Sequence, residues 1–244
     1  MSTYVYGIAA SSHPALPEGA KGVGDPPMTV RVLRQGPLAV LVSNAPEGLR
    51  PKRRDLLAHQ NVLVEAGAEG CVLPMRFGSL APDDAAVTEV LAQRAEHFRE
   101  RLEALENKVE YNLKANHLEE AVLHRVLADT PELRSLAEAN RRAGGGSYEQ
   151  KLRFGEMVAT AVRAREAEDA AAVRAALEPL ATDVCVGPES TGWLANVSFL
   201  VDRDNSAAFV EAVDAFRKTH AHLEVRLGGP LPPYSFVEPG PGPE

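Results

Sequence analysis

Hydrophobic residues that alternate with polar ones predict strands in several parts of the chain. Residues 108–115 show the clearest alternation, because Val109, Tyr111 and Leu113 are separated by polar residues, as in a strand buried on one face. An Arg-Gln-Gly-Pro turn at 34–37 joins two apolar runs and predicts a hairpin. The expected strands are 3–10, 29–33, 38–43, 71–78, 108–115, 183–186, 194–202 and 222–227.

Apolar residues spaced three or four apart predict helices, and 82–107 shows a regular example of this spacing. Asp83 and Asp84 lie in its first turn, where acidic side chains stabilise a helix. Its apolar seam most simply packs in the core, and it would also serve as a partner-helix surface if the strands left one side open. The seam consists of Val87, Leu91, Ala95, Phe98, Leu102 and Leu105. Further helices are expected over 51–67, 117–128, 131–142 and 147–180, and around Phe209–Phe216.

The two halves of the chain share one order of expected elements. Each has a strand, a variable segment, a hairpin, a helix and a final strand, which ends in Arg76-Phe77-Gly78 or in Arg226-Leu227-Gly228. Ferredoxin-like βαββαβ units have this order, with the first helix degraded in the N-terminal half and expanded in the C-terminal half. We expect a duplicated α+β chain with domains 1–107 and 108–244; coincidence between short strand patterns is the alternative.

Composition narrows the function class. The 244 residues carry 26 Lys and Arg against 34 Asp and Glu, a formal charge of −8, which argues against nucleic-acid binding because phosphate contacts need a basic face. No apolar run approaches the roughly 20 residues that span a bilayer. No basic or long apolar segment follows Met1, so we expect no signal peptide. Cys71 and Cys185 lack metal-type spacing and are expected to be buried thiols in the cytoplasm.

Residues that could carry catalysis or bind a metal are scattered. The glycine-rich segment 144–147 lacks a P-loop lysine and is expected to be a hinge. His117, His220 and His222 do not form a closed ligand set by spacing, so they are expected to be solvated surface histidines. No nucleophile elbow occurs in the sequence. We therefore expect no catalytic residues, no metal ligands and no cofactor.

Two segments suggest binding to other proteins. Lys52-Arg53-Arg54 is a basic cluster that is either a solvated turn or a docking site for an acidic partner. The proline-stiffened tail from Leu231 to Phe236 either packs back as a lid over its own domain or stays exposed as a binding segment.

Several segments, in the same order along the chain, resemble the GvpF/GvpL family of gas vesicle proteins. They are Tyr4–Ile8, Val72–Ser79, Val109–Lys114, Asn196–Asp202 and Gly229–Phe236. Met75 stands where a smaller β-branched residue is expected, and nothing distinguishes the F branch from the L branch. The candidate motif and interface residues are Leu73, Pro74, Arg76, Phe77, Gly78, Pro230, Pro232, Pro233, Tyr234 and Phe236. Arg76 is expected to anchor its strand by pairing with a carboxylate.

The resemblance implies an α+β fold with an N-terminal modified ferredoxin-like domain and a C-terminal α+β domain with long helices. It implies a non-enzymatic accessory or minor structural component of gas vesicles, the gas-filled shells that give buoyancy. The implied partners are the hydrophobic shell protein and other gas vesicle accessory proteins, with neither nucleic acid nor membrane, in the cytoplasm or at the vesicle. A small-ligand-binding ferredoxin-like sensor and a metal-dependent hydrolase are the alternatives.

Overall fold

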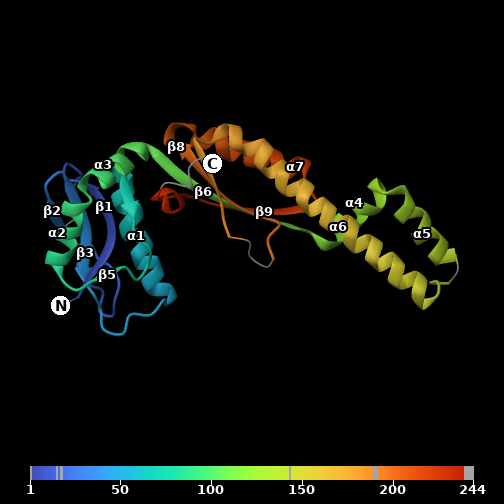
Figure 1. The fold of residues 1–244 in the computed structure, drawn as a ribbon, viewed down its shortest axis with the longest axis horizontal. Coiled ribbons are helices and arrows are strands. Elements are labelled where there is room, and N and C mark those ends of the chain that lie inside the picture. Colours follow the sequence, from blue (N-terminus) through green and yellow to red (C-terminus); the bar gives the residue numbers. More distant parts are fainter. Residues whose placement is uncertain (1, 15, 17–18, 143, 189–191, 239–244) are drawn as a thin grey trace. The chain divides into compact units, whose positions relative to one another are not determined.

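The chain forms two compact units, each built on one β-sheet (Figure 1). The computed structural model describes residues 2–14, 16, 19–142, 144–188 and 192–238. Met1–Glu110, Asp202–Asp204 and Gly229–Glu244 make up the first unit, and Tyr111–Val201 with Asn205–Gly228 the second. This division groups the C-terminal tail with the first unit, whereas the sequence pattern placed it in the second domain.

The first unit contains an antiparallel sheet and three helices. Its elements are β1 (Thr3–Ala10), β2 (Arg31–Gln35), β3 (Leu38–Asn44), α1 (Arg53–Glu69), β4 (Val72–Pro74), β5 (Leu80–Ala81), α2 (Asp84–Gln93) and α3 (Ala95–Ala104). The strand order is β2-β3-β1-β4, and β5 pairs with β1.

The second sheet has strand order β7-β8-β6-β9. The remaining elements of the chain are β6 (Lys108–His117), α4 (Glu119–Asp129), α5 (Pro131–Arg142), α6 (Tyr148–Leu177), η1 (Glu178–Leu180), β7 (Asp183–Val186), β8 (Ala195–Asp202), η2 (Arg203–Asn205), α7 (Ser206–Thr219), β9 (Leu223–Leu231) and η3 (Tyr234–Phe236). Counted along the chain, both sheets follow the order second, third, first, fourth, so the repeated order expected from the sequence is confirmed. Helices α4–α6 occupy the first crossover of the second sheet, whereas the described residues between β1 and β2 contain no helix.

Helices cover both faces of the first sheet. All six residues from Leu38 to Ser43 of β3 are buried, which requires apolar cover on each side. Tyr4 and Tyr6 of β1 pack in one cluster with Val62 and Leu63 of α1. Thr3 points to the other face, where its hydroxyl donates to Asp84 at the start of α2 (2.5 Å).

The prediction of a single helix over 82–107 is wrong, because the structure has two helices there, α2 and α3, which meet at Arg94. Arg94 has φ −112° and ψ 22°, outside helical geometry, and ends α2 while preceding α3. The seam itself is buried within the first unit, as Val87, Leu91, Phe98 and Leu102 show. It is therefore core packing and leaves no open face for a partner helix.

The expected strand 71–78 is shorter than predicted and ends in a tightly bonded turn. The N–H of Met75 still donates to the carbonyl of Tyr6 (2.8 Å), but Gly78 adopts φ 88°, a conformation that favours glycine. The N–H of Gly78 donates to the hydroxyl of Tyr4 (3.2 Å). The Arg-Phe-Gly motif is therefore a turn fixed to the first strand.

His59 of α1 completes this network as a neutral imidazole. Its Nε2 lies 3.0 Å from the carbonyl of Met75, which can only accept, so Nε2 carries the proton. Its Nδ1 then accepts from the hydroxyl of Tyr4 (2.9 Å), and the ring of Phe77 lies edge-on to it. Burial lowers the pKa of His59, although its bond to Met75 opposes that shift. A second proton would leave the Tyr4 hydroxyl without its acceptor.

The loop between β1 and β2 is held against the core by a second tyrosine. The hydroxyl of Tyr6 accepts from the N–H of Val23 (2.9 Å) and contacts Ser43 Oγ (3.1 Å). A Cβ at Gly22 would lie 1.8 Å from the Tyr6 hydroxyl, so only glycine fits there. The buried carboxylate of Asp55 accepts from the N–H of Gly24 (2.9 Å). This loop thus takes the place of the missing crossover helix.

In the second unit, α7 packs on the sheet through aromatic side chains. Phe209 stacks on Tyr111 of β6 and contacts Phe199 of β8, with ring centroids 5.2 and 5.4 Å apart. The alternation of β6 is confirmed at Tyr111 and Leu113, which are buried, and at Asn112, which is half-buried, but it fails at Glu110, which is buried although it is polar. Helices α4, α5 and α6 form a separate small core around Val122, Val126 and Leu133.

Two of the histidines expected to be solvated are buried in the second unit. His117 and His222 both contact the carboxylate of Asp169 on α6, whose side chain is 2% exposed. Burial alone would raise the pKa of Asp169, but hydrogen bonds from His117, His222 and Arg165 lower it below its ordinary value. Burial lowers the pKa of His222, against the opposing effect of Asp169. The prediction of solvated histidines was wrong because partners 52 and 53 residues away bury them.

None of the described helices is both long enough and apolar enough to cross a membrane.

The pH dependence of stability tests the His59 network. Because the pKa of folded His59 lies below its ordinary value of about 6.5, the unfolded chain binds a proton first as the pH falls. His59 should therefore lower the free energy of unfolding from about pH 6.5 down to its folded pKa, by up to about 1.4 kcal/mol per pH unit. Above that range its contribution should be constant. Urea titrations from about pH 7.5 to about pH 5 measure the slope.

Two variants test whether His59 causes the decline in the free energy of unfolding with falling pH. His59→Gln removes the titrating ring and should give a shallower decline in the free energy of unfolding. His124→Gln, at an exposed position of α4, should keep the wild-type slope. Equal slopes for all three proteins would contradict the assignment.

Candidate binding site

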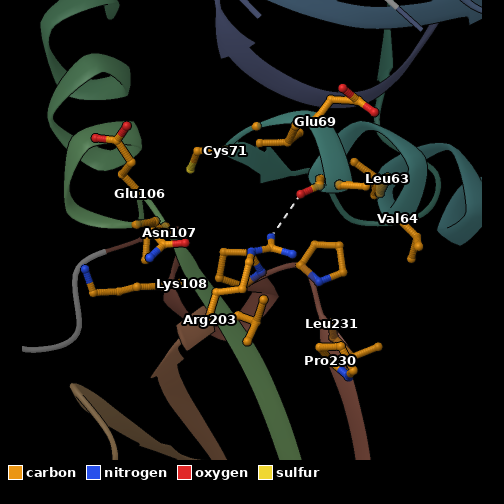
Figure 2. A pocket seen from close by; sticks show the side chains of 18 residues that line it. Leu63, Val64, Glu69, Cys71, Glu106, Asn107, Lys108, Arg203, Pro230 and Leu231 are labelled. Carbon is orange, nitrogen blue, oxygen red and sulfur yellow. Dashed lines mark hydrogen bonds between the residues drawn. The ribbon is translucent and has the colours of Figure 1, made fainter. Parts of the chain in front are cut away.

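A groove of about 430 Å³ lies on the first unit (Figure 2). One wall is the second half of α1 and the segment that leads into β4. The opposite wall is the proline-rich segment Pro230–Pro233, and residues 105–109 with Arg203 complete the lining. Segments far apart in sequence thus meet at one surface.

Most of the groove lining is apolar. Leu63 and Val72 of the lining are buried, whereas the apolar side chain of Val64 is 45% exposed to solvent. Leu57 lies seven residues before Val64, on the same face of α1, and is 47% exposed. Pro230, Pro232 and Pro233 have no N–H, so they offer a bound chain apolar rings. The carbonyls of Pro232 and Pro233 already accept from the N–H groups of Tyr234 and Phe236.

Arg203 is the charged side chain that crosses the groove. Its Nη2 donates to the carbonyl of Gly67 in the last turn of α1 (3.0 Å; Figure 2). A cation at the C-terminus of a helix is favourable because it offsets the helix dipole. The backbone N–H of Arg203 donates to the carbonyl of Asn107 (2.8 Å). Glu69, Glu106 and Lys108 add charges of both signs to the lining.

The thiol of Cys71 also lines the groove, and burial raises its pKa to about 11. It is therefore protonated at neutral pH and a poor nucleophile. The groove residues that the structure describes offer apolar contact and hydrogen bonding, which suits binding rather than catalysis.

The tail is fixed to the first unit by two anchors. Glu110 is buried and accepts from both the N–H (2.8 Å) and the hydroxyl (2.7 Å) of Ser235. Arg101 of α3 donates to the carbonyls of Phe236 (2.6 Å) and Val237 (3.1 Å). Phe236 is buried. Of the two expectations for the tail, packing back onto the protein is the one observed, and it packs on the first unit.

The two sequence motifs meet at one hydrophobic cluster, and both also contribute residues to the groove. Phe77 of the first motif and Tyr234 of the second both pack against the cluster that contains Tyr4 and Leu63. Leu73 and Pro74 are buried in β4, Gly78 forms the turn, and Phe236 is buried in the tail. Among the ten candidate motif and interface residues, Pro230, Pro232 and Pro233 line the groove.

Arg76 does not form the expected ion pair. It is exposed, and no carboxylate in the described parts of the chain pairs with it. Its carbonyl instead accepts from the hydroxyl of Ser79 (2.8 Å). The backbone turn, rather than the guanidinium, therefore anchors this motif.

Sequence reasoning missed the groove residues outside the motifs. Val64 lies in the helix expected over 51–67, and its exposure depends on what packs nearby. Arg203 stands between two aspartates with no pattern that points to Gly67, 136 residues away. A helical apolar stripe wider than its core face is the one sequence signal that could have identified Leu57 and Val64.

Comparison with known proteins identifies relatives along the full chain. Gas vesicle protein F of Streptomyces sp. (strain CB03234) is 67% identical over 238 residues, which covers 98% of this chain and 100% of that protein. Gas vesicle protein L of the same strain is 30% identical over 256 residues, covering 96% and 92%.

Two solved structures share the fold. The crystal structure of GvpF from Anabaena sp. PCC7120 matches with a TM-score of 0.77 at 24% identity, covering 98% of this chain and 99% of that one. GvpF from Microcystis aeruginosa matches with a TM-score of 0.72 at 23% identity, covering 97% and 99%. The profile of gas vesicle synthesis protein GvpL/GvpF matches residues 2–238. The chain therefore belongs to the GvpL/GvpF family, whose members are gas vesicle proteins and not enzymes.

Proposed function

We propose that this chain is an accessory protein of gas vesicle formation that binds the hydrophobic shell subunit and helps to nucleate or assemble the vesicle wall. Family membership supports a role with other gas vesicle proteins. The observation that carries the proposal is the groove of the first unit, whose apolar lining includes the exposed Val64, with Leu57 also exposed two turns earlier on the same face of α1.

The chemistry of a shell subunit fits such a groove. A subunit with an apolar surface aggregates unless another protein covers that surface before it joins the wall. Val64 and the prolines opposite would cover an apolar segment of the subunit, and Arg203 and Lys108 would attract acidic groups beside it. Burying a side chain the size of valine or leucine contributes about 1.5–3 kcal/mol.

A charge placed in the groove tests this proposal. Val64→Glu should lower capture of the co-expressed shell subunit by at least about tenfold, because binding would bury a carboxylate against an apolar segment of the subunit. Val90→Glu is the matched control, since Val90 lies on α2 of the same unit and is 47% exposed but does not line the groove. It should capture the subunit as the wild type does.

Thermal melting accompanies the capture experiment. Both substitutions are at exposed positions, so both should change the free energy of unfolding by no more than about 0.5 kcal/mol. Equal capture by Val64→Glu and Val90→Glu would contradict binding in the groove. Loss of capture by both variants, with melting unchanged, would also contradict it.

The anchors of the tail predict a separate effect on stability. Phe236→Ala should lower the free energy of unfolding by about 3 kcal/mol or more, because it empties a buried site. Glu110→Gln should cost about 1–3 kcal/mol, since an amide cannot accept two hydrogen bonds from Ser235 in the same way. Urea denaturation of the full chain measures both changes.

An exposed glutamate provides the control for this pair. Glu119→Gln, at the start of α4, should change the free energy of unfolding by less than about 0.5 kcal/mol. Wild-type stability of both Phe236→Ala and Glu110→Gln would show that the tail does not contribute to the fold of the first unit.

A further inference from the structure

Three side chains from three elements converge in the second unit. His117 ends β6, Asp169 lies in the C-terminal half of α6, and His222 precedes β9. Their side chains are 7%, 2% and 5% exposed. Neither the gas vesicle family nor the proposed binding of a shell subunit explains why this polar group is buried.

The geometry of the cluster matches a set of metal ligands. Nε2 of His117 and Nε2 of His222 lie 2.9 and 2.8 Å from the same oxygen, Oδ2 of Asp169. The three atoms all lie within 4.8 Å of one another. A tetrahedral zinc ion with bonds of about 2.0–2.1 Å separates its ligand atoms by roughly 3.3 Å, so each histidine nitrogen would have to move away from Oδ2 of Asp169 by about 0.5 Å to admit one.

The surrounding charges favour a cation. Arg165 lies 3.1 Å from Oδ2 of Asp169, but its guanidinium also faces Asp129 (3.4 Å) and Glu168 (3.6 Å). Arg125 pairs with Asp129 as well. Three carboxylates therefore face two guanidinium groups, and the neighbourhood stays negative when the histidines are neutral. Arg165 also holds the Asp169 carboxylate in place, as partners outside a metal's ligand set commonly do.

His117 can change its tautomer without losing another bond. Its Nδ1 is buried, and no hydrogen-bond partner for it occurs among the described residues. A metal ion binds the Nε2 lone pair, so the proton must move to Nδ1. No existing bond on Nδ1 opposes that move, although the N–H formed there is buried without an acceptor among the described residues.

We propose that His117, Asp169 and His222 bind a divalent zinc ion that fastens α6 to the ends of β6 and β9. Two imidazole nitrogens and one carboxylate oxygen form a ligand set that suits zinc, and cobalt can replace it. A water molecule or a donor from a partner takes the fourth position. His220 is not a ligand, because its Nδ1 contacts the carbonyl of Phe216 (3.1 Å) and its ring stacks on Phe216.

Metal analysis of the full chain, expressed without a histidine tag, tests the site. The protein is stripped with a chelator, incubated with zinc alone and desalted, and its metal content is measured. The wild type should retain one equivalent. Because changes to outer partners already cost 10–100-fold in affinity, His222→Gln should bind zinc at least about 100-fold more weakly. His124→Gln, at an exposed position in the same unit, should retain one equivalent.

Cobalt gives a second readout that does not need a variant. The stripped wild type loaded with cobalt should show visible absorption bands of a nitrogen- and oxygen-bound ion, and one equivalent of zinc should abolish them. Zinc should also raise the melting temperature of the wild type and His124→Gln, but not of His222→Gln. Failure of the wild type to retain metal or to show cobalt bands would overturn the proposal. So would equal zinc affinity in a folded His222→Gln protein. Shell-subunit capture is measured separately and does not bear on this result.

Discussion

Two buried tyrosine hydroxyls on β1 hold the first unit together. Tyr4 connects the strand to His59 on α1 and to the turn at Gly78, and Tyr6 connects it to β3 and to the loop after β1. A buried hydroxyl without partners is costly, so each bond also fixes the segment that supplies it. The position of α1, and with it the groove wall at Leu63 and Val64, depends on these bonds.

The local pattern of apolar and polar residues was sufficient to predict most helices and strands, because the period of that pattern reflects which face of a segment is buried. β1 and α5 have the expected bounds, and the strand order repeated in both halves is the arrangement expected of ferredoxin-like units. The break at Arg94 escaped prediction because the apolar seam continues across it. The turn at residues 75–78 escaped because its bonds come from Tyr4 and His59.

Long-range polar contacts explain the other differences. Glu110 and Ser235 are 125 residues apart, and no period in the sequence connects them. His117 and His222 look like surface residues until Asp169 is brought to them by α6. The motifs at 73–78 and 230–236 could be identified from the sequence, but not their roles. Five of their residues pack in or against the core of the first unit, namely Leu73, Pro74, Phe77, Tyr234 and Phe236, and three prolines line the groove.

The turn between α5 and α6 contains three successive glycines with φ of 69°, 109° and 71°. Only glycine adopts such mirror-image backbone readily, and the following helix begins independently, with Ser147 and Gln150 bonded to each other's N–H groups. Residues 144–147 of this turn take part in no strand pairing. Extra glycine-rich sequence placed there, such as a fluorescent or affinity label, would therefore lengthen the crossover and leave the order of the strands intact.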